Sequence, residues 1–449
     1  MSLSFADPLA VPVAYLVAAL IGAIVVLNAR HPLARDGRLS LGVFFAGWLT
    51  SELPLHLVLS QVVGTAVFIR AGALRAWPGW VGLVLGVASA LALLEMFVQG
   101  RGAGEVIEKA VTDALGPEYA GRIDAELRRR LRTPMSRLQL ALPFALRHKG
   151  VARVRGLSYG PAGRRNQLDI YRSVEKTTGC PVLVQVHGGA WVLGDKKDQA
   201  LPLMMHLASL GWVCVAINYR LSPRATFPDQ IVDVKRAIAW VKANIAAHGG
   251  DPDFVVITGG SAGGHLSSLA ALTPGDPAFQ PGFEDADTSV RACVPFYGVY
   301  DFTNRSGLGR ADLRAFLGKL VFKKRYAAAP EIFDQASPMS RITAAAPPFL
   351  VIHGTHDTLA PVGEARLFVK LLREISRAVV AYAELPGAQH AFELFASARA
   401  GNVVRGVARF LAYQHAAYLE ARLPGAPALV QGSPGLEATA ATETVVAAE

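Results

Sequence analysis

Hydrophobic positions follow two different patterns along this chain, and the first is confined to the N-terminal hundred residues. The segment 9–27, LAVPVAYLVAALIGAIVVL, contains no charged residue. The segment 80–98, WVGLVLGVASALALLEMFV, contains only Glu95, close enough to its end to reach the bilayer surface. An apolar run of about 20 residues is long enough to cross a bilayer as a helix. Both segments are therefore predicted to span a membrane.

A third apolar segment, 41–69, has a weaker pattern. Glu52, Pro54 and His56 interrupt it near its centre, and ionisable groups within a membrane are costly unless they are paired. We expect this segment to pair with the other two helices or to be re-entrant, rather than to form a transport site. Residues 1–100 are thus predicted to be a membrane region of two or three helices.

The second pattern begins at residue 151, where short β-rich runs alternate with helical segments. Apolar residues between two of these runs recur at spacings of three and four, as on one face of a helix: Ile231, Val234, Ile238, Val241 and Ile245. Near-continuous apolar strands separated by helices predict an α/β fold, with a mostly parallel sheet covered on both faces. Residues 151–423 are assigned to this domain. The predicted strands are NQLDIYR, PVLVQVHGG, GWVCVAINYR, DFVVITGG, ACVPFYG, PFLVIHG and AVVAYAEL.

Charge and composition distinguish two further regions. The formal net charge is +10, and residues 101–155 supply +6 of it, from twelve Lys or Arg and six Asp or Glu. The cluster LRRRLR (127–132) has no interleaved aromatic residues, and no nucleic-acid-binding motif is present. We interpret residues 101–150 as a basic amphipathic juxtamembrane or cap region facing anionic lipid, with a solvated helix face as the alternative. The low-complexity residues 424–449 are predicted to be a disordered tail.

Cysteine usage argues against a disulfide framework and a metal centre. Cys180, Cys214 and Cys293 are few and scattered, and no Cys-x-x-Cys pair occurs. Cys214 lies within the apolar run GWVCVAI and is predicted to be a buried thiol. We expect no metal and no other cofactor.

The stretch VVITGGSAGGHLSSLAAL (255–272) places one hydroxyl among four glycines, after a β-rich run and before an apolar, alanine-rich one. Its Gly-x-Ser-x-Gly core predicts a sharp strand-to-helix turn that exposes Ser261 as a nucleophile. The five-residue pattern alone is weak, but the flanking strand and helix strengthen it. A serine hydroxyl needs an imidazole base, and that base needs a carboxylate to orient it.

Later segments supply both partners. His390 follows the last predicted strand in ELPGAQHAFE, and Asp357 follows a buried strand in LVIHGTHDTLAP. Asp301 is the alternative acid. His353 and His356, which flank Asp357, are alternative bases, although a role in shaping that loop fits them better. His265, directly after the nucleophile, is interpreted as a packing residue.

A fourth element, VLVQVHGGAWVLGDK (182–196), supplies backbone donors. Attack on an ester creates an oxyanion that needs N–H groups already directed at it. The candidates are Gly188 and Gly189, with Ala262 after the nucleophile as the third. His187 is then interpreted as structural, holding the loop through hydrogen bonds.

Taken together, HGGAW, NYRLSP, GGDPD, GGSAGGHL, HGTHDTLAP and GAQHAF resemble the hormone-sensitive-lipase-like carboxylesterases of the α/β-hydrolase superfamily. The resemblance covers roughly residues 151–420, and the preceding apolar segments make the chain similar to membrane-anchored Lip-type esterases of actinobacteria. It implies an α/β-hydrolase fold with Ser261, Asp357 and His390 as the triad and Gly188, Gly189 and Ala262 as the oxyanion hole. The family's usual His-Gly-Gly-Gly is here His-Gly-Gly-Ala followed by Trp191, a form that also occurs in arylformamidase-like and feruloyl-esterase-like relatives.

These expectations combine into a serine carboxylesterase for esters of short to medium acyl chains, with a cap insertion at about 301–335. An arylformamidase-like amide hydrolase is the alternative within enzymes. A catalytically inactive hydrolase that serves as a membrane-binding module is the alternative from another class. The arginines after the first apolar segment predict a multi-pass protein whose catalytic domain faces the cytoplasm, provided that the middle segment crosses.

Overall fold

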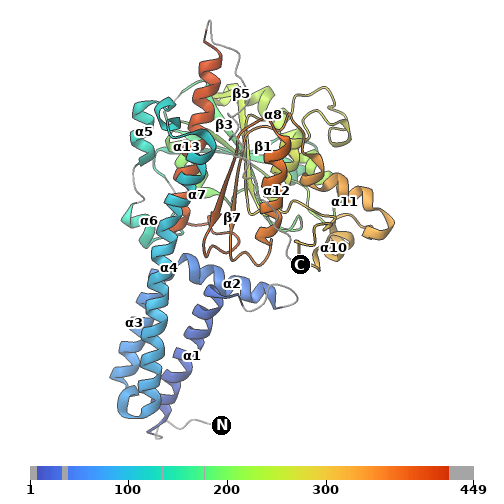
Figure 1. Ribbon diagram of the computed structural model, residues 1–449. Helices are drawn as coiled ribbons and strands as arrows, with labels where there is room; N and C mark the ends of the chain where they lie inside the picture. The colour runs from blue at the N-terminus through green and yellow to red at the C-terminus, as the bar shows by residue number, and fades with distance from the viewer. Residues whose placement is uncertain (1–7, 33–38, 133–135, 147, 176, 424–449) are drawn as a thin grey trace, which may run out of the picture.

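A single mixed sheet organises the C-terminal part of the protein in this computed structural model, which describes residues 8–32, 39–132, 136–146, 148–175 and 177–423 (Figure 1). The expected tail at 424–449 lies outside the described residues. The eight strands found within them have the order β1-β2-β4-β3-β5-β6-β7-β8. Pairing is antiparallel between β1 and β2 and between β2 and β4, and parallel elsewhere, which confirms a mostly parallel sheet. The strands are β1 (Val151–Ser158), β2 (Gln167–Ser173), β3 (Cys180–Val186), β4 (Val213–Ile217), β5 (Gly250–Gly260), β6 (Cys293–Phe296), β7 (Phe349–Gly354) and β8 (Val380–Leu385).

The seven predicted strands correspond to β2–β8, whereas β1 was not predicted. β1 lies at the edge of the sheet and is half-buried or exposed along its length. Arg153 and Arg155 interrupt its apolar run, so the sequence carries no buried-strand pattern there. Arg153 Nε donates to Asp169 Oδ2 on β2 at 3.0 Å, which ties this edge strand to its neighbour.

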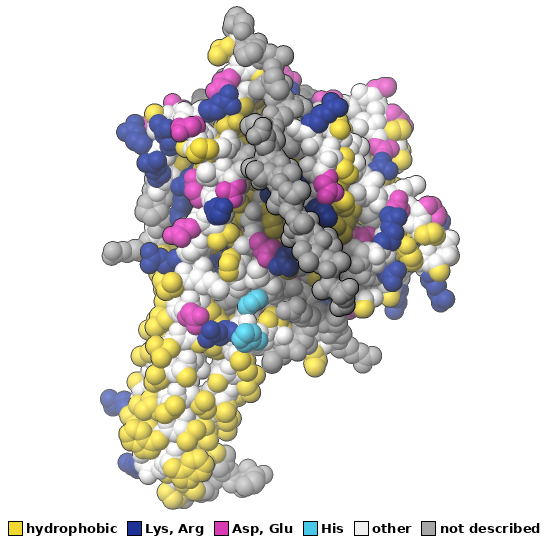
Figure 2. Space-filling model, viewed as in Figure 1, with side chains coloured by type: hydrophobic (Ala, Val, Ile, Leu, Met, Phe, Trp, Pro, Cys, Tyr) yellow, Lys and Arg dark blue, Asp and Glu magenta, His cyan; other side chains and the backbone are white. Residues whose placement is uncertain are grey.

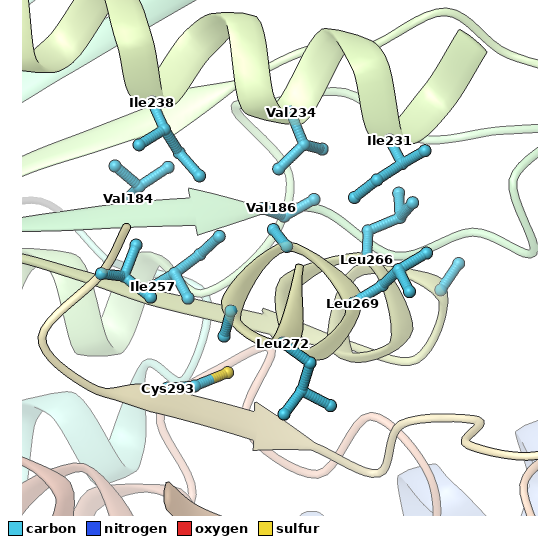
Figure 3. Close-up of a cluster of buried hydrophobic side chains, with 14 of the residues drawn as sticks. Val184, Val186, Ile231, Val234, Ile238, Ile257, Leu266, Leu269, Leu272 and Cys293 are labelled. Carbon is cyan, nitrogen blue, oxygen red and sulfur yellow. The ribbon is translucent and has the colours of Figure 1, made fainter. Parts of the chain in front are cut away.

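Helices cover both faces of the sheet, as the apolar strands require. The α8 and α9 helices pack on one face, together with α12. Figure 3 shows side chains of α8 and α9 meeting those of β3 and β5. The α7 and α13 helices and the second half of α4 cover the other face. The bounds are α4 (Trp77–Leu115), α7 (Leu201–Ser209), α8 (Asp229–Asn244), α9 (Ala262–Leu272), α12 (Val362–Ile375) and α13 (Ala398–Ala421).

The N-terminal helices form a bundle that projects from the sheet domain. Helices α1 (Ala10–Arg30), α3 (Pro54–Arg70) and α4 lie side by side (Figure 1). Within the described residues, α1 and α4 are the two single helices long and apolar enough to cross a membrane. Apolar side chains dominate the bundle surface, and charged ones gather on the sheet domain (Figure 2). This separation is what a bilayer around the bundle requires.

The α4 helix joins the two parts of the protein without a break. Its 39 residues correspond to a length of about 58 Å, almost twice the thickness of a hydrocarbon core. Its first half packs against α1 and α3, and its second half packs against α13 and β8. Residue 100, where we expected the membrane region to end, therefore lies inside one continuous helix.

The middle apolar segment is two helices rather than one. Helix α2 (Ser40–Glu52) is bent by 90° against α3, and Pro54 is the first residue of α3. Proline has no N–H and clashes with the preceding turn, so a helix ends before it. As a result α2 lies across the end of the bundle, between the bundle and the sheet domain (Figure 1).

Short helices complete the molecule. The expected cap insertion contains α10 (Leu313–Phe316), a π-helical turn (Leu317–Val321) and α11 (Pro330–Ala336). Helix α6 (Arg137–Ala141) adjoins the bundle, because His56 Nε2 on α3 lies 3.2 Å from the carbonyl oxygen of Ala141. Helix α5 (Ala125–Arg132) instead packs against α13, on the upper part of the sheet domain (Figure 1).

Candidate active site

Ser261 occupies a strained turn between β5 and α9. Its backbone angles are φ 58° and ψ −121°, a combination that residues other than glycine seldom adopt. The neighbouring glycines allow the turn to pack closely. A Cβ at Gly263 would lie 2.1 Å from the carbonyl oxygen of Val186, and one at Gly259 would lie 2.4 Å from that of Gly263. This close approach explains why small residues surround the one hydroxyl.

His390 and Asp357 come from two different loops and meet in a hydrogen bond. His390 Nδ1 lies 2.7 Å from Asp357 Oδ2. The other carboxylate oxygen of Asp357 accepts from the backbone N–H groups of Leu359 and Ala360, both at 2.8 Å. Burial alone would raise the pKa of Asp357, but the charge of His390 and the hydrogen bonds from His353 and His390 hold it well below its usual range. Asp357 is therefore a carboxylate that orients the imidazole.

The alternative acid lies elsewhere. Asp301 Oδ1 accepts from the backbone N–H of Thr303 at 3.0 Å, and its Oδ2 accepts from the hydroxyl of Ser306 at 3.3 Å. These contacts stabilise its own loop. Of the two carboxylates, Asp357 is the one that contacts His390.

The other candidate histidines make structural contacts. His353 Nε2 lies 2.7 Å from the carbonyl oxygen of Ala360, and His356 Nδ1 lies 3.2 Å from that of Ala29 at the end of α1. Burial lowers the pKa of His187 and of His265 to about 4, which keeps both neutral at pH 7.

The loop after β3 approaches the serine. Gly189 has φ 117°, and a Cβ there would lie 2.2 Å from the carbonyl oxygen of Leu193. The N–H of Gly188 donates to Gln199 Oε1 at 2.5 Å. Tyr219 stacks on the ring of His187, with 4.3 Å between centroids, and donates to its carbonyl oxygen at 2.9 Å. His187 thus holds the loop in place.

Ser261 and His390 line one cavity of about 490 Å³. Within the described residues no hydrogen bond joins Ser261 Oγ to His390; such contacts often tighten only when substrate binds. Tyr297 lies against the imidazole, with 4.4 Å between ring centroids. The remaining wall is mostly apolar and comes from α2, the loop after β3, the cap and the loops that hold Asp357 and His390. Its apolar residues are Leu41, Phe44, Phe45, Trp48, Ala190, Trp191, Leu193, Val299, Leu313, Phe316, Leu359, Ala360, Ala391 and Leu394.

Two parts of this wall were not predicted from the sequence. Helix α2 belongs to the segment that we expected to lie in the membrane, and Gln199 stands in a polar loop without a motif. No residue described in 105–149 lines the cavity, although part of the cap was expected there.

Within the described residues, no group of three or more His, Cys, Asp or Glu side chains could hold a metal ion.

Comparisons with known proteins show which family the chain resembles. The family model described as BD-FAE matches residues 168–372. The chain is 47% identical over 418 residues to "Probable carboxylic ester hydrolase LipM" of Mycobacterium tuberculosis, covering 91% of this chain and 95% of that protein. It is 42% identical to "Esterase LipQ" of the same organism, covering 82% of this chain and 83% of that protein. A truncated carbohydrate esterase from gut microbiota superposes with a TM-score of 0.50 at 25% identity, covering 58% of this chain and 96% of that one.

Proposed function

Because this chain belongs to the hormone-sensitive-lipase-like carboxylic ester hydrolases of the Lip type, we propose that Ser261, His390 and Asp357 are its catalytic triad. The protein is a carboxylic ester hydrolase with an α/β-hydrolase fold. The observation that carries the triad is the 2.7 Å contact between His390 Nδ1 and Asp357 Oδ2, beside a cavity that Ser261 also lines.

In the proposed reaction, Ser261 Oγ attacks the ester carbonyl carbon and its proton passes to His390 Nε2. The bond from carbonyl carbon to alkoxy oxygen then breaks, and His390 protonates the departing alcohol. A water molecule attacks the acyl-enzyme in the same way and releases the carboxylic acid. Asp357 holds the Nδ1–H tautomer throughout and stabilises the transient imidazolium.

Backbone N–H groups of Gly188, Gly189 and Ala262 are the proposed donors to the oxyanion. Each donor of this kind typically contributes on the order of 3 kcal/mol in the transition state. In the free enzyme Gly188 N–H donates to Gln199 Oε1. That hydrogen bond has to be exchanged for one to the oxyanion during the reaction.

The proposed substrates are esters of short to medium acyl chains, because the apolar cavity holds about 490 Å³ and the cap adjoins it. The relatives compared above are named as ester hydrolases, which favours esters over the formyl amides of an arylformamidase. The test measures kcat/KM on p-nitrophenyl esters of increasing acyl length and on N-formylkynurenine. We expect a maximum at short to medium chains and a much slower amide reaction. A faster formyl-amide reaction, or no turnover of any ester, would contradict the proposal.

The proposed organisation is a membrane region at 1–100, a juxtamembrane region at 101–150 and a catalytic domain at 151–423 with a cap at about 301–335. Helices α1, α3 and α4 would each cross the bilayer, with α2 at its surface. Arg70 and Arg75 then lie at the far end, and the many basic residues of 101–155 lie on the catalytic side. Positive charge favours the cytoplasmic side, so the catalytic domain would be cytoplasmic.

Anionic lipid is the proposed contact of the basic region, through the part nearest the bundle. Helix α6 adjoins α3, whereas α5 follows the far end of α4, about 24 Å beyond Gln99. Screening limits surface potentials to about 8 Å at physiological salt. The cluster at 127–132 therefore contributes little to lipid binding.

A protease test addresses the orientation. A C-terminal epitope tag should survive protease added to intact cells and be lost after the membrane is permeabilised. Loss of the tag from intact cells would place the catalytic domain outside.

A further inference from the structure

Helix α2 forms a wall of the catalytic cavity although it belongs to the N-terminal apolar region. Phe44 meets the His390 ring edge-on, with 6.1 Å between centroids. Trp48 Nε1 donates to the carbonyl oxygen of Ala391 at 2.9 Å. These contacts bring a helix from the membrane end of the protein against the loop that holds the proposed base.

Both ends of α2 are fixed to the catalytic domain. At its C-terminal end, Glu52 accepts from Arg399 Nε at 2.8 Å and from the Ser397 hydroxyl at 2.7 Å. Both charged side chains of this pair are fully buried. At its N-terminal end, Ser40 Oγ accepts from Arg310 Nη2 of the cap segment at 3.2 Å. Helix α2 is therefore joined to the sheet domain at both of its ends.

The mouth of the cavity is marked by residues that line it and are also exposed. Three of them are apolar: Leu41 and Phe45 of α2, exposed by 55% and 48%, and Leu193, exposed by 61%. Asp312 of the cap segment lines the cavity and is also exposed, and it pairs with the mostly buried Arg310, with 2.7 Å between Nη2 and Oδ2. Exposed apolar side chains together with a charged group suit the boundary between lipid tails and headgroups.

The position of α2 places that opening at the end of the bundle (Figure 1). Glu52 is the one charged residue of α2, and it is buried. A helix with no exposed charge and with exposed leucine and phenylalanine, perpendicular to α3, can lie in the interfacial plane of the bilayer. The apolar surface of the bundle extends toward the end that adjoins the sheet domain, where α2 lies (Figure 2).

We propose that the substrate is an ester dissolved in the bilayer, which enters the site sideways past Leu41 and Phe45. This inference rests on the proposed function and names its substrate class. The apolar body of the ester stays against α2 and the lipid while the ester group reaches Ser261. The cavity needs to admit only the acyl part, so a short or medium acyl chain is compatible with a large lipophilic alcohol.

The test uses the full-length protein in proteoliposomes and two butyrate esters. Methylumbelliferyl butyrate is supplied in water, and hexadecyl butyrate is dissolved in the same bilayer as the enzyme. The total amounts of ester and enzyme are held constant, and more phospholipid is added before reconstitution, which lowers the mole fraction of hexadecyl butyrate in the bilayer. The rate of hexadecyl butyrate hydrolysis should fall in proportion to that mole fraction. A rate that does not change with the mole fraction would contradict entry from the bilayer.

Two matched variants locate the path. Leu41→Ser on α2 should lower kcat/KM on hexadecyl butyrate about tenfold more than on methylumbelliferyl butyrate. Leu59→Ser on α3, at a site of similar exposure that does not line the cavity, should change neither rate. Equal effects of Leu41→Ser on both esters, or an effect of Leu59→Ser on the hexadecyl ester alone, would overturn the proposal. Failure of the wild type on both esters would instead contradict the proposed function.

Discussion

Trp48 and Ala391 are 343 residues apart in sequence and are joined by a hydrogen bond of 2.9 Å, from the indole Nε1 to the carbonyl oxygen. Ala391 directly follows His390. This bond links a helix of the N-terminal apolar region to the loop that holds the imidazole. The N-terminal apolar region is thus part of the candidate active site.

Trp48→Phe tests the effect of this bond. Loss of one such hydrogen bond costs about 1 kcal/mol, which corresponds to a fall in kcat of about fivefold if the His390 loop loses its position. Trp80→Phe is the control, because Trp80 Nε1 donates to Leu74 at 3.1 Å on the far side of the bundle. Steady-state kinetics on a soluble ester should show the fall for Trp48→Phe alone. Equal kinetics for both variants would exclude a positioning role.

The choice of acid is tested by two Asp→Asn variants. Asp357→Asn should lower kcat about ten-thousand-fold with little change in KM, because the imidazole would lose the partner that fixes its tautomer. Asp301→Asn should have a small effect, since Asp301 contacts its own loop. A more severe loss in Asp301→Asn would show that Asp357 is the wrong acid.

The ion pair of Glu52 and Arg399 is expected to hold α2 in place. Glu52→Gln leaves the buried Arg399 without its counter-charge, and loss of one partner of such a pair costs about 3–5 kcal/mol. Asp113→Asn removes an exposed partner of Lys109 on α4 and should cost less than about 1 kcal/mol. Thermal unfolding in detergent measures the difference. Equal midpoints for the two variants would contradict this role of Glu52.

Ionisation of Glu393 should lower the stability of the protein as the pH rises toward neutrality, against the opposite contribution of the buried neutral histidines His187 and His265. Burial raises the pKa of Glu393 from 4.5 to about 7, while Tyr297 donates to its carboxylate at 2.5 Å. A raised pKa means that the folded state favours the protonated form. The stabilisation that protonated Glu393 gives to the folded state is therefore complete below pH 4.5. About 3 kcal/mol of it is lost as the pH rises through 7.

Glu393→Gln should remove this contribution and leave a similar one from Glu364, whose pKa burial also raises to about 7. Glu331→Gln, at an exposed position, is the control. Unfolding midpoints between pH 4.5 and 8 measure the slope for each protein. An unchanged slope in Glu393→Gln would show that this carboxyl ionises normally.

The alternation of apolar strands and helices was sufficient to predict the mostly parallel sheet and seven of its strands. Ser261, Asp357 and His390 follow recognisable strands, so their separate positions at strand ends were also predictable. The edge strand β1 was missed because an edge strand needs no continuous apolar run, and its arginines resemble those of the preceding basic region.

The role of α2 was not predictable, because its partners lie far away in sequence. Glu52 and Pro54 indicated an interruption of the apolar segment, and the structure shows a 90° bend there. Nothing in SLGVFFAGWLTSE specifies that Glu52 pairs with Arg399 or that Phe44 meets His390. Such contacts depend on tertiary packing, which local periodicity does not encode.

The central claim is that Ser261 is the nucleophile of an ester hydrolase, and covalent labelling tests it most directly. A fluorophosphonate probe should attach to Ser261 in the native protein, as intact-mass and peptide mass spectrometry would show. Ser261→Ala should lose both the label and the esterase activity, while Ser209→Ala should keep both. Undiminished labelling or ester hydrolysis in Ser261→Ala would contradict the account.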